Sequence, residues 1–262
     1  MPGSDRRPKP TGGARVSPRD RFITIYGRMP VLEALGDRSL PIDKVIIAYN
    51  AAGRSVDDIV HAARRRNIPV EEASPTRVKL LAGNGRHDQG VVADVVARRM
   101  MPLADFLTGR GDRPTTVFLL DGITNPSNVG MILRTASGAG VDGVVLPRQG
   151  SPHVGPLVIK ASAGVAFRAP ILTVGGAAEA AARLRAAGYT LYGLSARADR
   201  SLFEARFAPR SALVLGGETS GLSVSTDTDL AIPLHGDVES LNVSAAAAVV
   251  AFEVTRRRAP RR

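Results

Sequence analysis

The stretch Val117-Phe-Leu-Leu-Asp121, followed by Asn125-Pro-Ser-Asn-Val-Gly-Met-Ile-Leu-Arg134, decides the fold class of this chain. A short, uninterrupted apolar run that ends at an acidic residue is typical of a parallel strand buried on both faces. The residues after it predict a helix that begins near Asn128. Further strands are predicted at Gly143 to Leu146, Tyr189 to Leu194, Ala212 to Leu215 and Leu230 to Ile232, with helices at Ala177 to Ala187 and Leu241 to Arg256.

Strands that alternate with helices predict an α/β domain with an open parallel sheet over residues 115–258. A ligand site in such a sheet is expected at the carboxyl ends of the strands. Upstream, residues 22–99 predict a smaller α/β unit. Its expected elements are helices at Met29 to Leu35 and Val56 to Arg66, and strands at Lys44 to Ala48, Pro69 to Glu71 and Gly90 to Val96.

Three further segments are expected to lie outside these two domains. Residues 1–21 contain four Pro and three Gly with few large apolar side chains, which predicts a disordered leader. Residues 100–114 are interpreted as a linker that carries one short helix at Leu103 to Leu107. Residues 259–262 form a basic tail.

The composition narrows the classes of function. The 262 residues include 44% hydrophobic and 23% charged residues, which is enough for a packed core. With zero cysteines and only four histidines, disulfides, thiolate metal sites and a catalytic zinc site are not expected, so we predict no metal. No run approaches the roughly 18 apolar residues of a membrane helix, and we expect a cytoplasmic protein without a membrane partner.

The net charge of +11 lies mainly at the two ends of the chain. Residues 1–21 carry a net +4 and Arg256 to Arg262 a net +5, which leaves +2 for the body. Basic arms can bind phosphates through counterion release, or they can be solvated segments that only aid solubility. The distribution favours an RNA partner.

Three motifs follow predicted strands. They are the Asn125 to Arg134 stretch, Leu215-Gly-Gly-Glu-Thr-Ser-Gly221 and Ile232-Pro-Leu-His-Gly-Asp-Val-Glu-Ser-Leu-Asn-Val-Ser244. The glycine patterns of dinucleotide and P-loop folds are missing where a first strand meets its helix. Gly217 to Gly221 also departs from a nucleophile elbow, because Thr219 stands where the serine would be.

Together the three motifs resemble those of the SpoU (TrmH-like) class of RNA ribose 2′-O-methyltransferases in the SPOUT superfamily. The resemblance runs from about Tyr26 to the C-terminus. It implies a parallel-sheet SPOUT domain with a trefoil knot, a small N-terminal L30e-like RNA-binding domain, a homodimer and S-adenosylmethionine as cofactor. In the N-terminal unit, Gly27 to Leu35 matches the usual opening, and His87-Asp-Gln-Gly90 is similar to a His-Gln-Gly signature with Asp88 inserted.

The resemblance also assigns roles to residues of this chain. It gives the catalytic set as Asn128, Arg134, Glu218, Ser240 and Asn242. It gives cofactor contacts as Leu194, Ser195, Gly216, Gly217, Ile232, Leu234 and Leu241, and RNA contacts as Arg28, His87 and Lys160.

Simpler interpretations of the same residues stay open. Arg134 can accept the 2′-hydroxyl proton, although an arginine keeps its own proton at neutral pH, or it can grip the target phosphate. Asn128 can be a helix N-cap and Ser240 the cap of the last helix. Gly216 and Gly217 can serve a turn instead of a close approach to a ligand.

The expected activity is RNA 2′-O-methylation, with 23S ribosomal RNA favoured as substrate, a link to antibiotic resistance left open, and no DNA partner. The alternatives are a tRNA 2′-O-methyltransferase, a catalytically silent RNA-binding or ribosome-assembly factor, and a small-molecule α/β enzyme. The last would leave the arginine-rich ends and the N-terminal unit without a purpose. Cofactor binding separates the enzyme from the silent factor.

Overall fold

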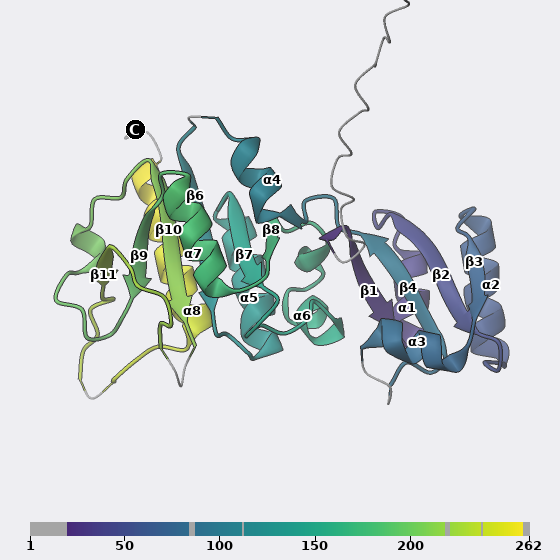
Figure 1. Cartoon of the computed structure of the whole chain (residues 1–262). Helices are drawn as coiled ribbons and strands as arrows, with labels where there is room; N and C mark the ends of the chain where they lie inside the picture. The colour runs from purple at the N-terminus through teal and green to yellow at the C-terminus, as the bar shows by residue number, and fades with distance from the viewer. Residues whose placement is uncertain (1–19, 84–86, 112, 218–220, 237, 259–262) are drawn as a thin grey trace, which may run out of the picture.

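The computed structural model describes residues 20–258, apart from 84–86, 112, 218–220 and 237. Two sheets, formed by separate parts of the chain, lie side by side in Figure 1. The first has four strands and the second has seven. The division into an N-terminal and a C-terminal α/β unit therefore agrees with the sequence prediction.

The small sheet is mixed. It contains β1 (Phe22–Tyr26), β2 (Ile42–Ala48), β3 (Val70–Ala73) and β4 (Val91–Val96), in the order β1-β4-β2-β3. The central strand β4 is antiparallel to β1 and β2, whereas β2 and β3 are parallel. Consequently β1, β2 and β3 all end at the same edge of the sheet, where the 87–90 loop also lies before β4.

Helices cover both faces of this sheet. Helices α1 (Arg28–Gly36) and α2 (Arg54–Arg65) share one apolar core with alternate residues of the strands. Helix α3 (Pro75–Ala82) packs on the other face, against Ile46, Ala48 and Val92. The sequence predicted α1, α2, β2, β3 and β4 to within a few residues but missed β1 and α3.

The large sheet is parallel throughout its described strand pairs. Its order is β11-β9-β10-β6-β7-β8-β5. The strands are β5 (Met101–Pro102), β6 (Thr115–Asp121), β7 (Gly143–Pro147), β8 (Ile171–Val174), β9 (Thr190–Leu194), β10 (Arg210–Gly216) and β11 (Thr228–Leu230).

Alternate residues of the central strand β6 face two different cores. Phe118 and Leu120 pack with α5 (Pro126–Gly138), α6 (Pro156–Ala161) and α8 (Val243–Arg258). Val117 and Leu119 pack with α4 (Leu103–Thr108) and α7 (Ala177–Ala186) on the opposite face. This two-sided burial explains why β6 is apolar without interruption. Two short 3-10 helices, Val165–Phe167 and Leu202–Glu204, lie in the connections.

Helix α5 carries the first motif and packs closely on α6. A Cβ atom added to Gly130 would lie 2.6 Å from the carbonyl oxygen of Val158 and 2.7 Å from Cβ of Ala161. Any larger residue at position 130 would push the two helices apart, which gives the glycine of this motif a packing role.

The segment interpreted as a linker is partly built into the large domain. Strand β5 pairs with β8 at the sheet edge, and Leu103 and Phe106 of α4 are buried. The two-residue strand was not predicted because so short a run carries no periodic signal. Nearby, the buried carboxylate of Asp20 accepts hydrogen bonds from Arg148 and from Oγ1 of Thr173, which fastens the start of the N-terminal unit to the large sheet.

The C-terminal arginines differ from the solvated arm that their charge suggested. Helix α8 continues to Arg258, so Arg256, Arg257 and Arg258 belong to the fold. Arg256 and Arg257 both pair with the buried Glu253, and Arg258 pairs with Asp142. Three of the five arginines in this stretch thus have intramolecular anions, and their charge cannot be counted as a free basic tail. Within the described residues, no helix has the length and apolar character to cross a membrane.

Candidate functional site

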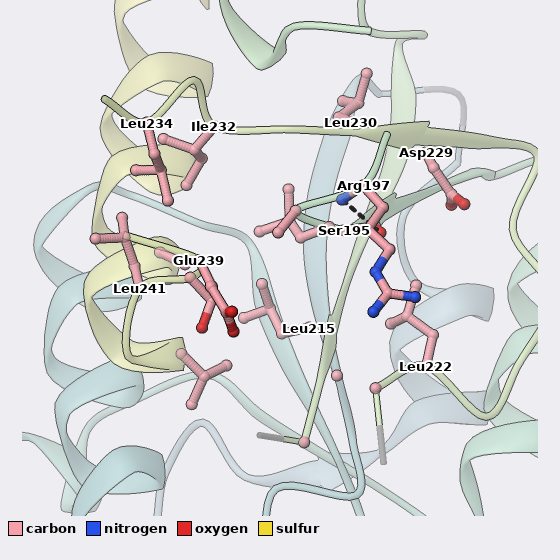
Figure 2. Close-up of a pocket in the computed structure, with 18 residues that line it drawn as sticks. Ser195, Arg197, Leu215, Leu222, Asp229, Leu230, Ile232, Leu234, Glu239 and Leu241 are labelled. Atoms are coloured by element: carbon pink, nitrogen blue, oxygen red, sulfur yellow. Dashed lines mark hydrogen bonds between the residues drawn. The ribbon is translucent and has the colours of Figure 1, made fainter. Parts of the chain in front are cut away.

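A cavity of about 860 Å³ lies at the carboxyl ends of β9, β10 and β11 (Figure 2). It therefore occupies the edge of the sheet where the strand pattern predicted a ligand site. Its walls come from the segments after β9, β10 and β11 and from the start of α8. Ser240 lines the cavity. So do all seven residues that were predicted to contact the cofactor, namely Leu194, Ser195, Gly216, Gly217, Ile232, Leu234 and Leu241.

Most of the cavity wall is apolar. Besides the predicted leucines and Ile232, it includes Leu215, Leu222, Leu230, Val243 and Ala246. Figure 2 shows Leu234, Ile232 and Leu241 on one side, with Ser195 and Leu222 across from them. Such a surface suits a flat, partly apolar group such as a purine, while backbone amides and carbonyls at the strand ends supply directed hydrogen bonds.

The described glycines of the second motif line one end of the cavity and lie close to each other. A Cβ atom on Gly216 would lie 2.6 Å from the backbone carbon and oxygen of Gly221. The Gly217 amide donates to the carbonyl of Asp121 at 2.9 Å, and the Gly221 amide donates to the carbonyl of Gly217 at 3.0 Å. Gly216 is thus required by the fold of its own loop, which supports the turn interpretation for this position.

Asp121, at the end of β6, holds the following segment in place. Its buried carboxylate accepts hydrogen bonds from the amide of Ser223 at 2.5 Å, from the Ser223 hydroxyl at 2.6 Å and from the amide of Val224 at 3.1 Å. These contacts join the end of β6, just before the first motif, to the segment that follows the second motif. The sequence marked Asp121 only as a strand end, because its partners lie about a hundred residues away in the chain.

Asn128 and Asn242 join the first and third motifs. The side-chain amide of Asn242 donates to Oδ1 of the buried Asn128 at 3.2 Å. Oδ1 of Asn242 also accepts from the backbone amide of Ser244 at 2.8 Å and from its hydroxyl at 2.6 Å. Asn242 therefore caps α8 and fixes its start against α5, beside the cavity-lining Ser240 and Leu241.

Both capping alternatives for the predicted catalytic residues are wrong. The N-cap of α5 is Asn125, whose Oδ1 accepts from the Ser127 amide at 2.9 Å, while Asn128 is already inside the helix. Helix α8 begins at Val243, so its cap is Asn242 and not Ser240. Ser240 instead faces the cavity.

Arg134 is not brought into the cavity of its own chain. It lies six residues beyond Asn128, about 9 Å further along α5, and its side chain is exposed. It makes no hydrogen bond or ion pair with any residue that the structure describes. Glu218 lies outside the described residues.

The predicted RNA contacts occupy separate places. His87 is exposed, on the loop before β4. Arg28 is engaged at the same edge of the small sheet, where its guanidinium donates to the carbonyl of Gln89 at 3.3 Å and to the hydroxyl of Ser55 at 3.0 Å. Lys160 is exposed on α6, in the large domain.

The inserted Asp88 has a local structural role. Its side chain is buried, and its carboxylate accepts a hydrogen bond from the Gly90 amide at 2.8 Å.

No group of three or more possible metal-ligating side chains occurs among the residues that the structure describes. The sequence reasoning missed three charged residues that line the cavity: Arg197, Asp229 and Glu239.

Comparison with known proteins agrees with this arrangement. Residues 115–252 match the model of the SpoU rRNA methylase family, and residues 24–101 match the model for RNA 2′-O ribose methyltransferase substrate binding. The chain belongs to the SpoU rRNA methylase family. The match to this SpoU model contains strands β6 to β11 and all three motifs, and the substrate-binding match contains β2, β3, β4 and most of β1.

Individual SpoU relatives match over nearly their whole length. The chain is 37% identical to the 23S rRNA (guanosine-2′-O-)-methyltransferase RlmB of Xanthomonas campestris, over 89% of this chain and 96% of the relative. It is 35% identical to the RlmB of Ralstonia nicotianae, over 83% and 88%. The solved structure of the SpoU methyltransferase AviRb from Streptomyces viridochromogenes, in complex with AdoMet, has a TM-score of 0.61 with 24% identity, covering 90% of each chain. That likeness shows the fold.

Proposed function

We propose that this protein transfers a methyl group from S-adenosylmethionine to a ribose 2′-hydroxyl of 23S ribosomal RNA. The observation that carries the proposal is the cavity at the strand ends, where the second and third motifs meet. Its support from relatives is the 37% identity to an enzyme named as a 23S rRNA guanosine-2′-O-methyltransferase. That name also favours guanosine as the target and ribosomal RNA over tRNA, and such a substrate places the protein in the cytoplasm.

The residues of the cavity fit this cofactor. The volume of about 860 Å³ lies within the range of about 300–1,000 Å³ that is usual for small-ligand sites. Apolar walls accept the adenosine, and we assign its contacts to Leu194, Ser195, Gly216, Gly217, Ile232, Leu234 and Leu241. When bound, S-adenosylmethionine would supply an electrophilic methyl group on a sulfonium, and its transfer to the 2′-oxygen would leave the neutral thioether S-adenosylhomocysteine and release the hydroxyl proton to water.

The chain's own side chains position the partners of this reaction. We infer that the hydrogen bond between Asn128 and Asn242 holds the third motif at a fixed distance from α5. Ser240 and Leu241 belong to this motif and are held with it. We assign Arg134 to the RNA, where its planar guanidinium can bind a phosphate next to the target ribose through two hydrogen bonds. Glu218, Ser240 and the RNA contacts of Arg28, His87 and Lys160 remain assignments from family resemblance. Two of the five N–H donors of Arg28 bond to Gln89 and Ser55, which fixes its side chain at this edge and leaves other donors for RNA.

We also propose that the protein works as a homodimer through the outer face of α5 and α8. These helices run side by side in the same direction: Met131 lies against Ser244, and Ala139 further along α5 accepts a hydrogen bond from Thr255. Met131 on α5 and Phe252 on α8 are exposed, and both are large apolar side chains. Exposed patches of this kind mark protein contacts. Arg134 shares the outward side of α5, so a second subunit there would shield it from solvent.

The trefoil knot and the domain limits are further parts of the proposal. The 195–209 segment contacts the chain on both sides of the third motif: the Leu202 amide donates to the carbonyl of Ala231, and Arg257 donates to the carbonyls of Phe203 and Ala205. This supports a C-terminal segment threaded past that loop. The proposed domains are an L30e-like unit over 22–99 and a SpoU unit over 115–258, with a leader, a linker and a short tail around them.

The proposal is tested by offering labelled S-adenosylmethionine with ribosomal RNA and, separately, with tRNA, each from a strain that lacks this gene. Nuclease digestion then identifies the labelled nucleoside. We expect labelled 2′-O-methylguanosine from ribosomal RNA only. Label in tRNA alone would show that tRNA, and not ribosomal RNA, is the substrate. If neither RNA is labelled although the folded protein binds RNA, the silent RNA-binding factor is favoured.

A further inference from the structure

Two long charged side chains line the cavity without a partner among the residues that the structure describes. Arg197 lies in the segment after β9, and Glu239 lies in the segment that leads into α8. Figure 2 shows the Glu239 carboxylate beside Leu241 and the Arg197 guanidinium across the cavity, next to Leu222. Both are exposed, and neither side chain forms a hydrogen bond or ion pair with a described residue.

The third charged residue of the cavity is different. Oδ1 of Asp229 accepts a hydrogen bond from the hydroxyl of Thr226 at 2.5 Å. The same oxygen lies 2.5 Å from where a Cβ atom on Gly193 would be, so it fills space at the strand end. One carboxylate oxygen of Asp229 is therefore held by the cavity wall, whereas the charged groups of Arg197 and Glu239 have no bond to a described residue.

We propose that Arg197 binds the carboxylate, and Glu239 the ammonium group, of the amino-acid part of S-adenosylmethionine. This inference rests on the proposed function. The two ligand groups have opposite charges and share one carbon atom, so a cation from one wall and an anion from the other can hold both at once. Charge-assisted hydrogen bonds of this kind are the strong ones, and a guanidinium matches a carboxylate with two parallel bonds. The apolar walls then receive the adenosine, and the charged end of the ligand faces the open side of the cavity.

The pairing of each residue with one group predicts a pattern across three ligands. S-adenosylmethionine has both the carboxylate and the ammonium. Its decarboxylated form has the ammonium alone, and 5′-methylthioadenosine has neither. Replacing a residue that binds only the carboxylate should lower the affinity for S-adenosylmethionine alone. Replacing a residue that binds the ammonium should lower the affinity for S-adenosylmethionine and for its decarboxylated form.

The test is calorimetric titration of the full chain with these three ligands. We expect Arg197→Met to lower the affinity for S-adenosylmethionine about tenfold, which is about 1.4 kcal/mol. The affinity for the decarboxylated ligand should be unchanged or higher. Glu239→Gln should lower the affinities for S-adenosylmethionine and for its decarboxylated form by a similar factor. Neither variant should change the affinity for 5′-methylthioadenosine, which also shows that the cavity is still folded.

Two matched controls separate direct contact from the general field of the protein. Arg200→Met and Asp199→Asn remove exposed charges from the same segment as Arg197 but do not line the cavity. They should leave all three affinities within about twofold, because exposed charges at a distance are screened by salt.

Several outcomes would overturn this inference. The inference fails if a variant loses affinity equally for all three ligands, or if neither variant loses affinity for any of them. If Arg197→Met loses affinity for RNA alone, Arg197 is assigned to RNA instead. Those results leave the proposed function intact as long as the unaltered protein binds S-adenosylmethionine. If the unaltered protein binds none of the three ligands, the proposed function fails and this inference fails with it.

Discussion

Helices α5 and α8 lie side by side, and their two ends hold different kinds of side chains. At the start of the pair, Asn128 and Asn242 bond to each other next to the cavity. At the far end, Arg256 and Arg257 pair with buried Glu253, and Arg257 also donates to two backbone carbonyls. Arg134 lies between the two ends without a described partner. Arginine content alone therefore says little about RNA binding, because the partners of each arginine determine whether it serves the fold or a ligand.

The largest effect in this comparison should come from Arg134→Ala. We expect methyl transfer to fall at least about 100-fold, the scale of losing a group that acts in the transition state. Affinity for S-adenosylmethionine and thermal stability should stay the same, because Arg134 neither lines the cavity nor bonds to a residue that the structure describes. Single-turnover methylation, measured together with cofactor titration and thermal unfolding, checks all three. Unchanged turnover would remove Arg134 from the mechanism.

Arg257→Met should show the opposite pattern. The substitution removes an ion pair to a buried carboxylate and two hydrogen bonds to the carbonyls of Phe203 and Ala205. We expect a loss of about 2 kcal/mol in the free energy of unfolding, since bonds to charged groups contribute about 1.5–3 kcal/mol each and Arg256 remains. Denaturant unfolding measures this loss. Activity per folded molecule should be retained, and a specific loss of RNA affinity instead would contradict the structural role.

Asn242→Ala should affect both the site and the fold. It removes the cap of α8 and the bond to Asn128, at a cost of about 1 kcal/mol in stability. Because the third motif would lose its fixed position, we expect S-adenosylmethionine to bind several-fold more weakly in calorimetry. Arg256→Met serves as a control, since it alters only the far end of α8. Equal cofactor affinity in Asn242→Ala and the unaltered protein would show that the Asn128–Asn242 contact is not needed for the cavity.

The smallest effect concerns acid stability at the far end. The hydrogen bond from Arg256, together with the one from Arg257, lowers the pKa of Glu253 from 4.5 to about 2, although burial acts in the other direction. A lowered pKa in the folded state means that this stabilisation is present above pH 4.5 and is lost as the pH falls toward 2. Thermal unfolding of Glu253→Gln should therefore lose part of the pH dependence seen between these values. An identical pH profile in both proteins would contradict the account.

The sequence predicts the elements that carry strong local signals. The apolar runs of β6, β7 and β10 and the helical periods of α2 and α7 appear where they were expected. Strand β8, with four residues, and helix α6, with six, were not predicted, because segments of this length carry only a weak periodic signal. Helix α3 had a signal that was overlooked: Ser74 caps it, with Pro75 at its first position.

For the site, the motifs identified the cavity-lining residues but not the contacts between them. Asp121 with Ser223 and Asn128 with Asn242 are separated by 102 and 114 residues, so only the folded chain shows that they meet. Glycine patterns could not show that Gly216 is needed by its own loop. Net charge was misleading for Arg256 to Arg258, because their anions lie in the fold.

The most direct test of the central claim is a map of 2′-O-methylation on ribosomal RNA from cells that lack this gene, compared with the same cells carrying either the unaltered gene or Arg134→Ala. We predict that one guanosine of 23S ribosomal RNA is unmethylated without the gene, regains its methyl group with the unaltered gene and stays unmethylated with Arg134→Ala. Identical 23S maps in all three would contradict the proposal that this protein methylates that RNA.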